Sequence, residues 1–289
     1  MVEHALPGDA LADPGGGRAL TRGQAAARLV AAGLVSLAAV LLFAVHVRPL
    51  AYVPLVLGVV LGLLVDRPLG RHLLLVAVGM ATVSAISLEA DLSDAGILRF
   101  GVALSLAVAL PWALSRYWLR DDVVRFPWRA RRPWTRVHWA YLVGVLGAGY
   151  LVLPWYFLSS GVWRNWPELE GGQEIARLFV GVAAVGTWDE LFFVCTVYAL
   201  LRRHFPPWQA NLLQMVVFVS FLWELGYRSW GPLLTIPFAL VQGFTFQRTA
   251  SLTYVLTVHL LFDAVVFAVL VHGHHPELFD VFVTAPASW

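Results

Sequence analysis

Long apolar stretches separated by short polar ones dominate the sequence. Nine such stretches can be distinguished, each about 17–28 residues long, which is enough for an α-helix to cross a hydrocarbon core of about 30 Å. Backbone groups exposed to lipid must find hydrogen-bond partners within their own segment, so helices are the predicted form. The nine predicted spans cover residues 27–47, 49–65, 70–88, 97–115, 138–158, 174–201, 208–226, 230–247 and 250–271.

The polar segments predict how the chain is divided. Residues 1–26 contain two prolines and three consecutive glycines, which predicts a flexible tail. This tail is too long and too acidic for the start of a signal peptide, so the first apolar stretch is interpreted as an uncleaved span. The other parts are an N-terminal set of membrane helices over 27–158 with a basic loop at 116–137, a core of helices over 174–271, and a C-terminal tail over 272–289.

Composition supports the membrane interpretation. Hydrophobic residues make up 59% of the chain and charged residues 13%, against roughly 45–50% and 25% in ordinary globular proteins. The mean hydropathy is +0.72, and a single cysteine, Cys195, excludes an intramolecular disulfide. We therefore predict an all-α, polytopic helical bundle in a bacterial inner membrane. Membrane lipid is an expected partner and nucleic acid is not.

Charged residues in the loops predict the orientation in the membrane. The loop over 116–136 carries seven arginines, and two more follow the sixth span. The loops after the third and fifth spans are acidic instead. The positive-inside rule makes the basic loops cytoplasmic and the acidic loops external, so nine alternating spans place the N-terminus in the cytoplasm. Binding of anionic lipid is a second interpretation of the arginine loop.

Ionisable residues occur inside the apolar stretches of the last third. Asp189 and Glu190 lie in the sixth stretch, Glu224 in the seventh, and His259 and Asp263 in the ninth. A charged side chain near the bilayer centre costs roughly 2.5–3.5 kcal/mol, so such groups must meet one another, a metal or water inside the bundle. We expect one interior cavity lined by Asp189 or Glu190, Glu224, His259 and Asp263. His259 should approach one of the tandem acids within roughly 8 Å.

The spacing of these groups favours a functional site. Asp189 and Glu190 are adjacent, about 100° apart on a helix, so both can border one cavity. His259 and Asp263 are four residues apart and share one helical face, which suits two metal ligands or an imidazole oriented by a carboxylate. The alternative for each group is structural, namely a buried hydrogen bond to a neighbouring helix. Two adjacent acids in one apolar stretch, together with a His–Asp pair in another, favour a functional site over a purely structural role.

Three further features have competing interpretations. Glu224 is followed at i+4 by Arg228, so an ion pair near the membrane surface competes with a place in the site. Cys195 could act as a nucleophile beside a histidine. On an α-helix, however, it points about 140° away from Glu190, and a buried cysteine is usually a small hydrophobe. Histidines at 272, 274 and 275 have no other ligand nearby and are interpreted as solvated.

These residues resemble the motifs of the CPBP intramembrane proteases, which include the CAAX-prenyl protease type 2 and bacteriocin-processing (Abi) groups. The family pattern is Glu-Glu-x-x-x-Arg, then Phe-x-x-x-His, then His-x-x-x-Asn or Asp. Asp189-Glu190 corresponds to the first motif, and His259-Leu260-Leu261-Phe262-Asp263 matches the third. The stretch Gly243–Tyr254 is also similar to the family's run into its final helix. The resemblance covers about residues 174–271, a third of the chain.

The chain departs from the family pattern at its charged positions. Asp189 is one methylene shorter than the family's glutamate, and Val194 stands where arginine is usual. The middle histidine has no counterpart in residues 221–225, where the nearest polar residue is Glu224. In the family, the resemblance implies, the first acid and the middle histidine activate a water. The last-helix pair stabilises the oxyanion or joins a metal.

The resemblance implies a divergent intramembrane endopeptidase that cuts a membrane-associated peptide or protein tail. Asp189 or Glu190 would be the general base, and His259, oriented by Asp263, would donate to the oxyanion. Glu224 would replace the missing histidine. Glu190, Glu224, His259 and Asp263 are also candidate ligands for a divalent metal such as zinc. One imidazole with carboxylates is a poor zinc set, so a site without metal stays open as well.

Two other classes of function stay open. A catalytically inactive pseudoprotease that binds membrane-anchored clients would explain the missing arginine and histidine. An ion-coupled transporter would use acids at the membrane midplane to carry ions. No inverted repeat is visible, however, and the acids gather in the last third of the chain, which favours the protease and pseudoprotease interpretations over transport.

Overall fold

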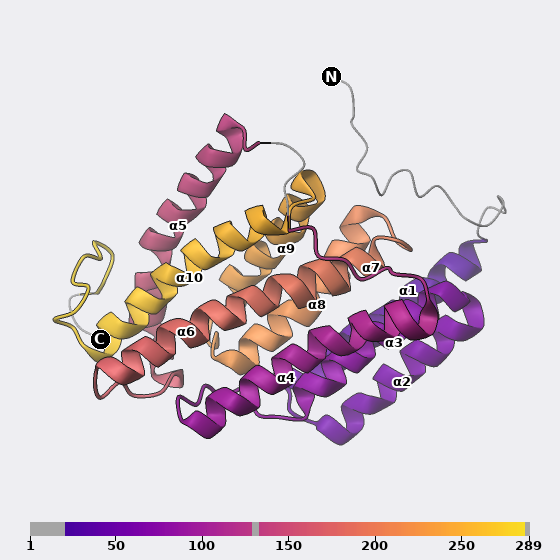
Figure 1. Ribbon diagram of the computed structural model, residues 1–289, viewed down its shortest axis with the longest axis horizontal. Coiled ribbons are helices and arrows are strands. Elements are labelled where there is room, and N and C mark those ends of the chain that lie inside the picture. Colours follow the sequence, from indigo (N-terminus) through magenta and orange to yellow (C-terminus); the bar gives the residue numbers. More distant parts are fainter. Residues whose placement is uncertain (1–20, 129–132, 287–289) are drawn as a thin grey trace.

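The computed structural model describes residues 21–128 and 133–286. Every regular element in these residues is a helix, which confirms the predicted all-α class. The long helices pack side by side in one tilted bundle (Figure 1). Most of the predicted flexible tail, residues 1–20, lies outside the described residues, as do residues 129–132 of the basic loop and 287–289 of the C-terminal tail.

The N-terminal half of the described chain contributes five long helices. The first begins at Thr21, whose hydroxyl accepts from the backbone N–H of Gln24 while the Gln24 side chain accepts from the Thr21 N–H. This capping box satisfies donors that a helix start leaves unpaired. The elements are α1 (Arg22–Ala39) with its π-helical end η1 (Val40–Ala44), α2 (Arg48–Val65), α3 (Arg67–Ser84), α4 (Asp94–Ala113) with its π-helical end η2 (Leu114–Leu119), and α5 (Arg136–Ser160).

The C-terminal half contains the helices that carry the ionisable residues. Its first long helix changes from α-helical to π-helical geometry directly after Asp189. π-helical turns are rare and frequently occur at functional sites. The elements are η3 (Val162–Asn165), α6 (Gly172–Asp189), the π-helical segment η4 (Glu190–Tyr198), α7 (Ala199–Leu201), α8 (Pro207–Leu225), α9 (Pro232–Thr249) and α10 (Leu252–His274).

Within the described residues, six helices are long and apolar enough to cross a membrane, which confirms a polytopic membrane protein. They are α1 with η1, α2, α4 with η2, α5, the continuous helix from α6 to α7, and α10. Helices α3, α8 and α9 lie at the other three predicted positions and carry more polar residues. The total of nine crossings therefore stays a prediction.

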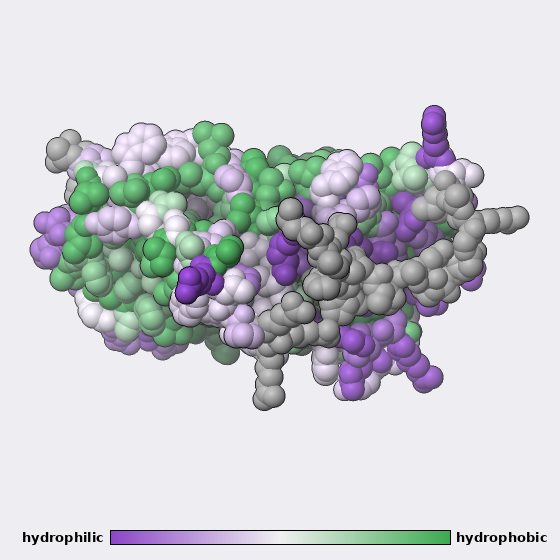
Figure 2. Space-filling view, turned by 90° about the horizontal axis from the view of Figure 1, so that it is seen from above, coloured by the Kyte–Doolittle hydropathy of each residue, from purple (hydrophilic) through white to green (hydrophobic). Residues whose placement is uncertain are grey.

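Basic and acidic loops gather at opposite ends of the bundle. The basic loop after α4 lies against the start of α10, where the Leu252 N–H donates to the Pro127 carbonyl. The acidic loop before α4 lies against the start of α6, where Arg177 pairs with Asp94 at 2.5 Å. Side chains facing outward from the middle of the helices are apolar, such as Val56 of α2, which is 57% exposed. In Figure 2 apolar side chains are frequent over the left and central parts of the visible face, and strongly hydrophilic side chains are most frequent toward its right-hand end.

A pair of histidines joins several elements at the basic end. His204 Nε2 lies 2.7 Å from His72 Nδ1, and Arg28 Nη2 lies 3.3 Å from His204 Nδ1. Burial lowers the pKa of His204 to about 3, so its ring is neutral at physiological pH. Because Arg28 can only donate, His204 Nδ1 accepts and its Nε2–H donates to His72. The remaining His72 nitrogen then faces Asp121 at 3.5 Å, and the chain of bonds holds α1, α3 and two loops together.

The segregated loops lead to a prediction about topology. Reporter fusions after Val137 and after Gly172 are expected to report opposite compartments, because α5 starts at the basic end and α6 at the acidic end. The positive-inside rule places Val137 in the cytoplasm. Alkaline phosphatase and green fluorescent protein fusions measure the two sides, with a fusion after His204 as the cytoplasmic control. If the Val137 and Gly172 fusions report the same side, α5 does not cross the membrane.

Candidate active site

Four of the predicted site residues meet inside the bundle. His259 Nδ1 lies 2.7 Å from Glu190 Oε1. His259 Nε2 lies 3.8 Å from Asp189 Oδ2 and 3.7 Å from Asp263 Oδ1. All four residues are buried, with 0–7% of their surface exposed. The imidazole therefore contacts the tandem acids well within the expected separation, and three carboxyl groups surround it.

The two tandem acids have different surroundings. Asp189 is the last residue of α6 and lines a cavity, whereas Glu190 begins η4 and is enclosed between α9 and α10. Gly186 lets α10 approach, since a Cβ added there would lie 1.9 Å from Asp263 Oδ2. The sequence predicted that Asp189 or Glu190 borders the cavity, and Asp189 does, whereas Glu190 contacts His259 without lining the cavity.

Gln242 of α9 is a member of the cluster that sequence reasoning missed. Its Nε2 donates to Glu190 Oε1 at 2.6 Å and to the Val255 carbonyl at 3.4 Å. Gln242 is 1% exposed. The one available signal was an amide placed among apolar residues of a predicted span, because buried amides need hydrogen-bond partners.

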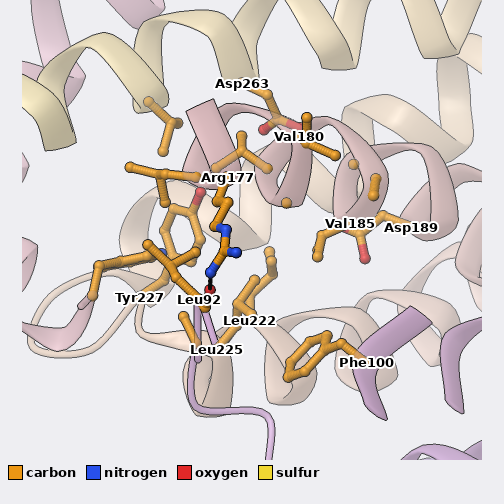
Figure 3. A pocket seen from close by; sticks show the side chains of 18 of the residues that line it. Leu92, Phe100, Arg177, Val180, Val185, Asp189, Leu222, Leu225, Tyr227 and Asp263 are labelled. Atoms are coloured by element: carbon orange, nitrogen blue, oxygen red, sulfur yellow. Dashed lines mark hydrogen bonds between the residues drawn. The ribbon is translucent and has the colours of Figure 1, made fainter. Parts of the chain in front are cut away.

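An apolar cavity of about 450 Å³ reaches the cluster. Figure 3 shows Asp263 at the top of the view, Asp189 at its right, and the Arg177 side chain reaching from α6 to the Leu92 carbonyl, a bond of 2.8 Å. Tyr227, between α8 and α9, also lines the cavity, and burial raises the pKa of its phenol well above the usual value. The phenol therefore stays protonated. A largely apolar cavity with a few convergent polar groups is typical of a binding site.

The cavity extends toward the lipid-facing surface between α4 and α6. Ile97 of α4 and Val180 of α6 both line it and are 42% and 63% exposed. Gly101 and Gly181 also line it, and a Cβ added at either would meet no atom within 4 Å. This side of the bundle therefore leaves the cavity open toward the surface between α4 and α6.

Glu224 does not join the cluster, contrary to expectation. Its Oε1 accepts from the Leu88 N–H at 3.4 Å and lies 3.8 Å from Arg48 Nη2 and 3.9 Å from His46 Nδ1. The residues of α8 that line the cavity are Leu222 and Leu225, three positions apart on one helical face. Glu224 points about 200° around the helix from Leu222, away from that face. The ion-pair interpretation of Glu224 is thus supported, with Arg48 as the partner instead of the expected Arg228.

Cys195 is buried, but not for the reason that the sequence suggested. It belongs to the π-helical segment, in which residue i+5 follows residue i by about one turn, so the α-helical angle of 140° from Glu190 does not apply. Its thiol is fully buried in an apolar cluster with Leu252 and Val255. A small hydrophobe is therefore the interpretation that the packing supports.

The histidines near the C-terminus are not fully solvated, which corrects the expectation: His272 is buried, and His274 and His275 are half-buried. His272 is 2% exposed and its Nδ1 lies 2.9 Å from the Leu278 carbonyl oxygen. His275 Nε2 lies 2.5 Å from the Leu169 carbonyl oxygen. These bonds hold the segment after α10 against the bundle, so the histidines have a structural role.

The candidate metal ligands fit a zinc site poorly. Among the residues that the structure describes, no three His, Cys, Asp or Glu side chains converge so as to hold a metal ion. Glu224 lies elsewhere, and Glu190 Oε1 is engaged by Gln242 and His259. One free imidazole nitrogen remains beside two carboxylates at 3.7–3.8 Å, whereas catalytic zinc sites take three close protein ligands.

A comparison with protein families identifies the segment that contains the cluster. Residues 171–265 match the family model of type II CAAX prenyl endopeptidase Rce1-like proteins. The match confirms the resemblance predicted from the motifs, and it runs from the turn before α6 to just beyond Asp263. The clustered acids, Gln242 and His259 all lie within it. No curated protein and no solved structure matches the chain significantly.

Proposed function

We propose that this protein is an intramembrane endopeptidase of the bacterial inner membrane that hydrolyses a peptide bond in a membrane-anchored protein or peptide. The observation that carries this proposal is the convergence of His259, Asp189, Glu190 and Asp263 beside an apolar cavity. The Rce1-like match over the same residues supports peptide hydrolysis. The exposed cavity walls on α4 and α6 support entry of the substrate from the lipid.

In the proposed reaction Asp189 is the general base. It borders the cavity, where its carboxylate can take a proton from a water while the water oxygen attacks the substrate carbonyl. The C–N bond then breaks, and the proton passes from Asp189 to the leaving amine nitrogen. The products are a new carboxyl group and a new amine, so water is the only co-reactant.

His259 is the proposed oxyanion donor. Its Nδ1–H donates to Glu190 Oε1 at 2.7 Å, which leaves Nε2 facing the cavity. Three carboxyl groups surround the ring, and nearby negative charge favours the positively charged imidazolium. In the proposed reaction both ring nitrogens therefore carry protons. The Nε2–H can then donate to the negative oxygen of the tetrahedral intermediate. Glu190, and not Asp263 as expected from the spacing, makes the hydrogen bond that orients the ring.

A client-binding pseudoprotease is the second candidate function. The side chains that α8 directs toward the cluster and its cavity are apolar. The Phe218 ring lies 6.3 Å from the His259 ring, and Leu222 and Leu225 line the cavity. Helix α8 therefore brings no second imidazole that could assist in activating water. This arrangement favours binding without cleavage over ion transport.

An assay in ¹⁸O-labelled water distinguishes the protease from the pseudoprotease. The purified protein in liposomes is expected to cut at least one of a panel of single-span and lipid-anchored model peptides. Mass spectrometry should find one ¹⁸O atom from H₂¹⁸O in the new carboxyl group. Cys195→Ser should cut at the wild-type rate, whereas a sulfur nucleophile would make it inactive. Peptides that bind but stay intact would establish the pseudoprotease instead.

A further inference from the structure

We infer that Gln242 is a positioning residue for the proposed hydrolysis, because its amide fixes the carboxylate that orients His259. The inference rests on the proposed function, but the contacts that carry it are observed directly. Gln242 lies on α9, whereas Glu190 begins η4 and His259 lies on α10. A single amide thus joins three of the helical segments around the site, α9, η4 and α10.

The orientation of the Gln242 amide is determined by its surroundings. Its Nε2 has two hydrogens and faces two acceptors, Glu190 Oε1 at 2.6 Å and the Val255 carbonyl at 3.4 Å. The reversed amide would place its oxygen against both acceptors, which provides no hydrogen bond. Val255 precedes His259 by four residues, about one turn of α10, so Gln242 connects Glu190 with the same helix that carries the imidazole.

Glu190 depends on these donors because water does not reach it. The residue is 0% exposed, and its Oε1 receives the two short contacts from Gln242 and His259. Its Oε2 is buried and has no hydrogen-bond partner among the described residues. Without the amide, His259 would be the sole remaining donor to Oε1, and hydrogen bonds to charged groups are the strong ones. The carboxylate could then rotate, and the direction of His259 Nε2 would no longer be fixed.

Gln242 itself lies behind the reactive groups. It is absent from the walls of the cavity, which Asp189, His259 and Asp263 border. Its loss should therefore change the rate of the chemical step through Glu190 and His259 and leave substrate binding as it is. Loss of a purely structural residue would not lower kcat while leaving KM unchanged.

The first test compares two glutamines on the same helix. Gln242→Met keeps the length of the side chain and removes both donors, so kcat should fall about 10–100-fold, as for other residues that orient an active-site ligand. KM should stay within about twofold. Gln247→Met is the matched control, since Gln247 Oε1 accepts from the Tyr198 hydroxyl at 2.9 Å away from the site. It should keep the wild-type kcat.

The second test asks whether a proton can replace the amide. In Gln242→Glu the introduced carboxyl group has the same shape but donates to Glu190 only when it is protonated. Activity relative to wild type should rise as the pH is lowered from 8 to 5.5, whereas the ratio for Gln242→Met should stay flat. The titratable groups around Glu190 and His259 are the same in both proteins and cancel in this ratio: Asp189, Asp263, Tyr141 and the buried thiol of Cys195.

The outcomes separate this inference from the proposed function. If wild type cuts no peptide, the proposed function fails and the positioning role fails with it. If wild type cuts and Gln242→Met keeps its kcat, or Gln247→Met loses as much, the inference alone is overturned. Gel filtration in detergent checks folding of each variant. If Gln242→Met does not fold, Gln242→Glu provides the test instead. The inference is overturned if the activity of Gln242→Glu relative to wild type does not change with pH.

Discussion

Asp189→Asn is expected to lower kcat for peptide hydrolysis by a factor of about 10²–10⁴ while the protein remains folded in the membrane. The amide has the same shape as the carboxylate but cannot accept a proton from water. Asp189 borders the cavity and lies 3.8 Å from His259 Nε2, so the substitution removes the proposed base where the substrate would bind. His259→Ala should cause a loss of similar size, because it removes the oxyanion donor.

Two carboxylates outside the proposed base position are the controls for this prediction. Glu224→Gln should keep nearly full activity, since Glu224 contacts Arg48 and the Leu88 N–H instead of the cluster. Glu190→Gln should reduce activity less than Asp189→Asn, because the amide oxygen can still accept from His259. Cleavage of a model peptide in liposomes measures all four variants. Should Asp189→Asn retain wild-type kcat while Glu224→Gln loses activity, the assignment of the base to Asp189 would be overturned.

The helices and most of the site could be predicted because their signals are local. Each apolar stretch must bond its own backbone groups in lipid, so the apolar pattern alone indicates where helices lie. A charged group inside such a stretch has a large cost, which singled out Asp189, Glu190, His259 and Asp263. The His-x-x-x-Asp spacing correctly placed one imidazole and one carboxylate on the same face of α10.

The remaining features depend on geometry that the sequence does not show. The π-helical segment after Asp189 changes which residues share a face, so angles calculated for an α-helix misplaced Cys195 relative to Glu190. Glu224 met the same burial criterion as the clustered acids, but its partner Arg48 lies on a helix far away in the sequence. Gln242 carries no charge, so it has no comparable cost in an apolar stretch and does not stand out. Such contacts between distant helices become visible only in the folded bundle.

Gly70→Ala is expected to destabilise the bundle strongly, although alanine is the better helix former. Helices α2 and α3 touch here through their backbones: a Cβ at Gly70 would lie 2.3 Å from Leu63 N and 2.5 Å from Leu63 Cα. Backbone atoms cannot rotate away as a flexible side chain can, so the two helices must separate. Overpacking costs about 1–3 kcal/mol, and 3 kcal/mol corresponds to a drop of roughly 6–12 °C in the unfolding midpoint of a chain of this size.

Gly144→Ala is the matched control and should change stability in the opposite direction. Gly144 lies on α5, and a Cβ added there would meet no atom within 4 Å. Alanine is favoured over glycine inside a helix by up to about 1 kcal/mol, so the unfolding midpoint should stay level or rise slightly. Fluorescence-detected gel filtration after heating in detergent measures both variants. Equal unfolding midpoints for Gly70→Ala and Gly144→Ala would contradict the close contact of α2 and α3. In that case Gly70→Leu should also fold. If the contact is as described, Gly70→Leu should yield almost no folded protein, because its larger side chain meets the same backbone.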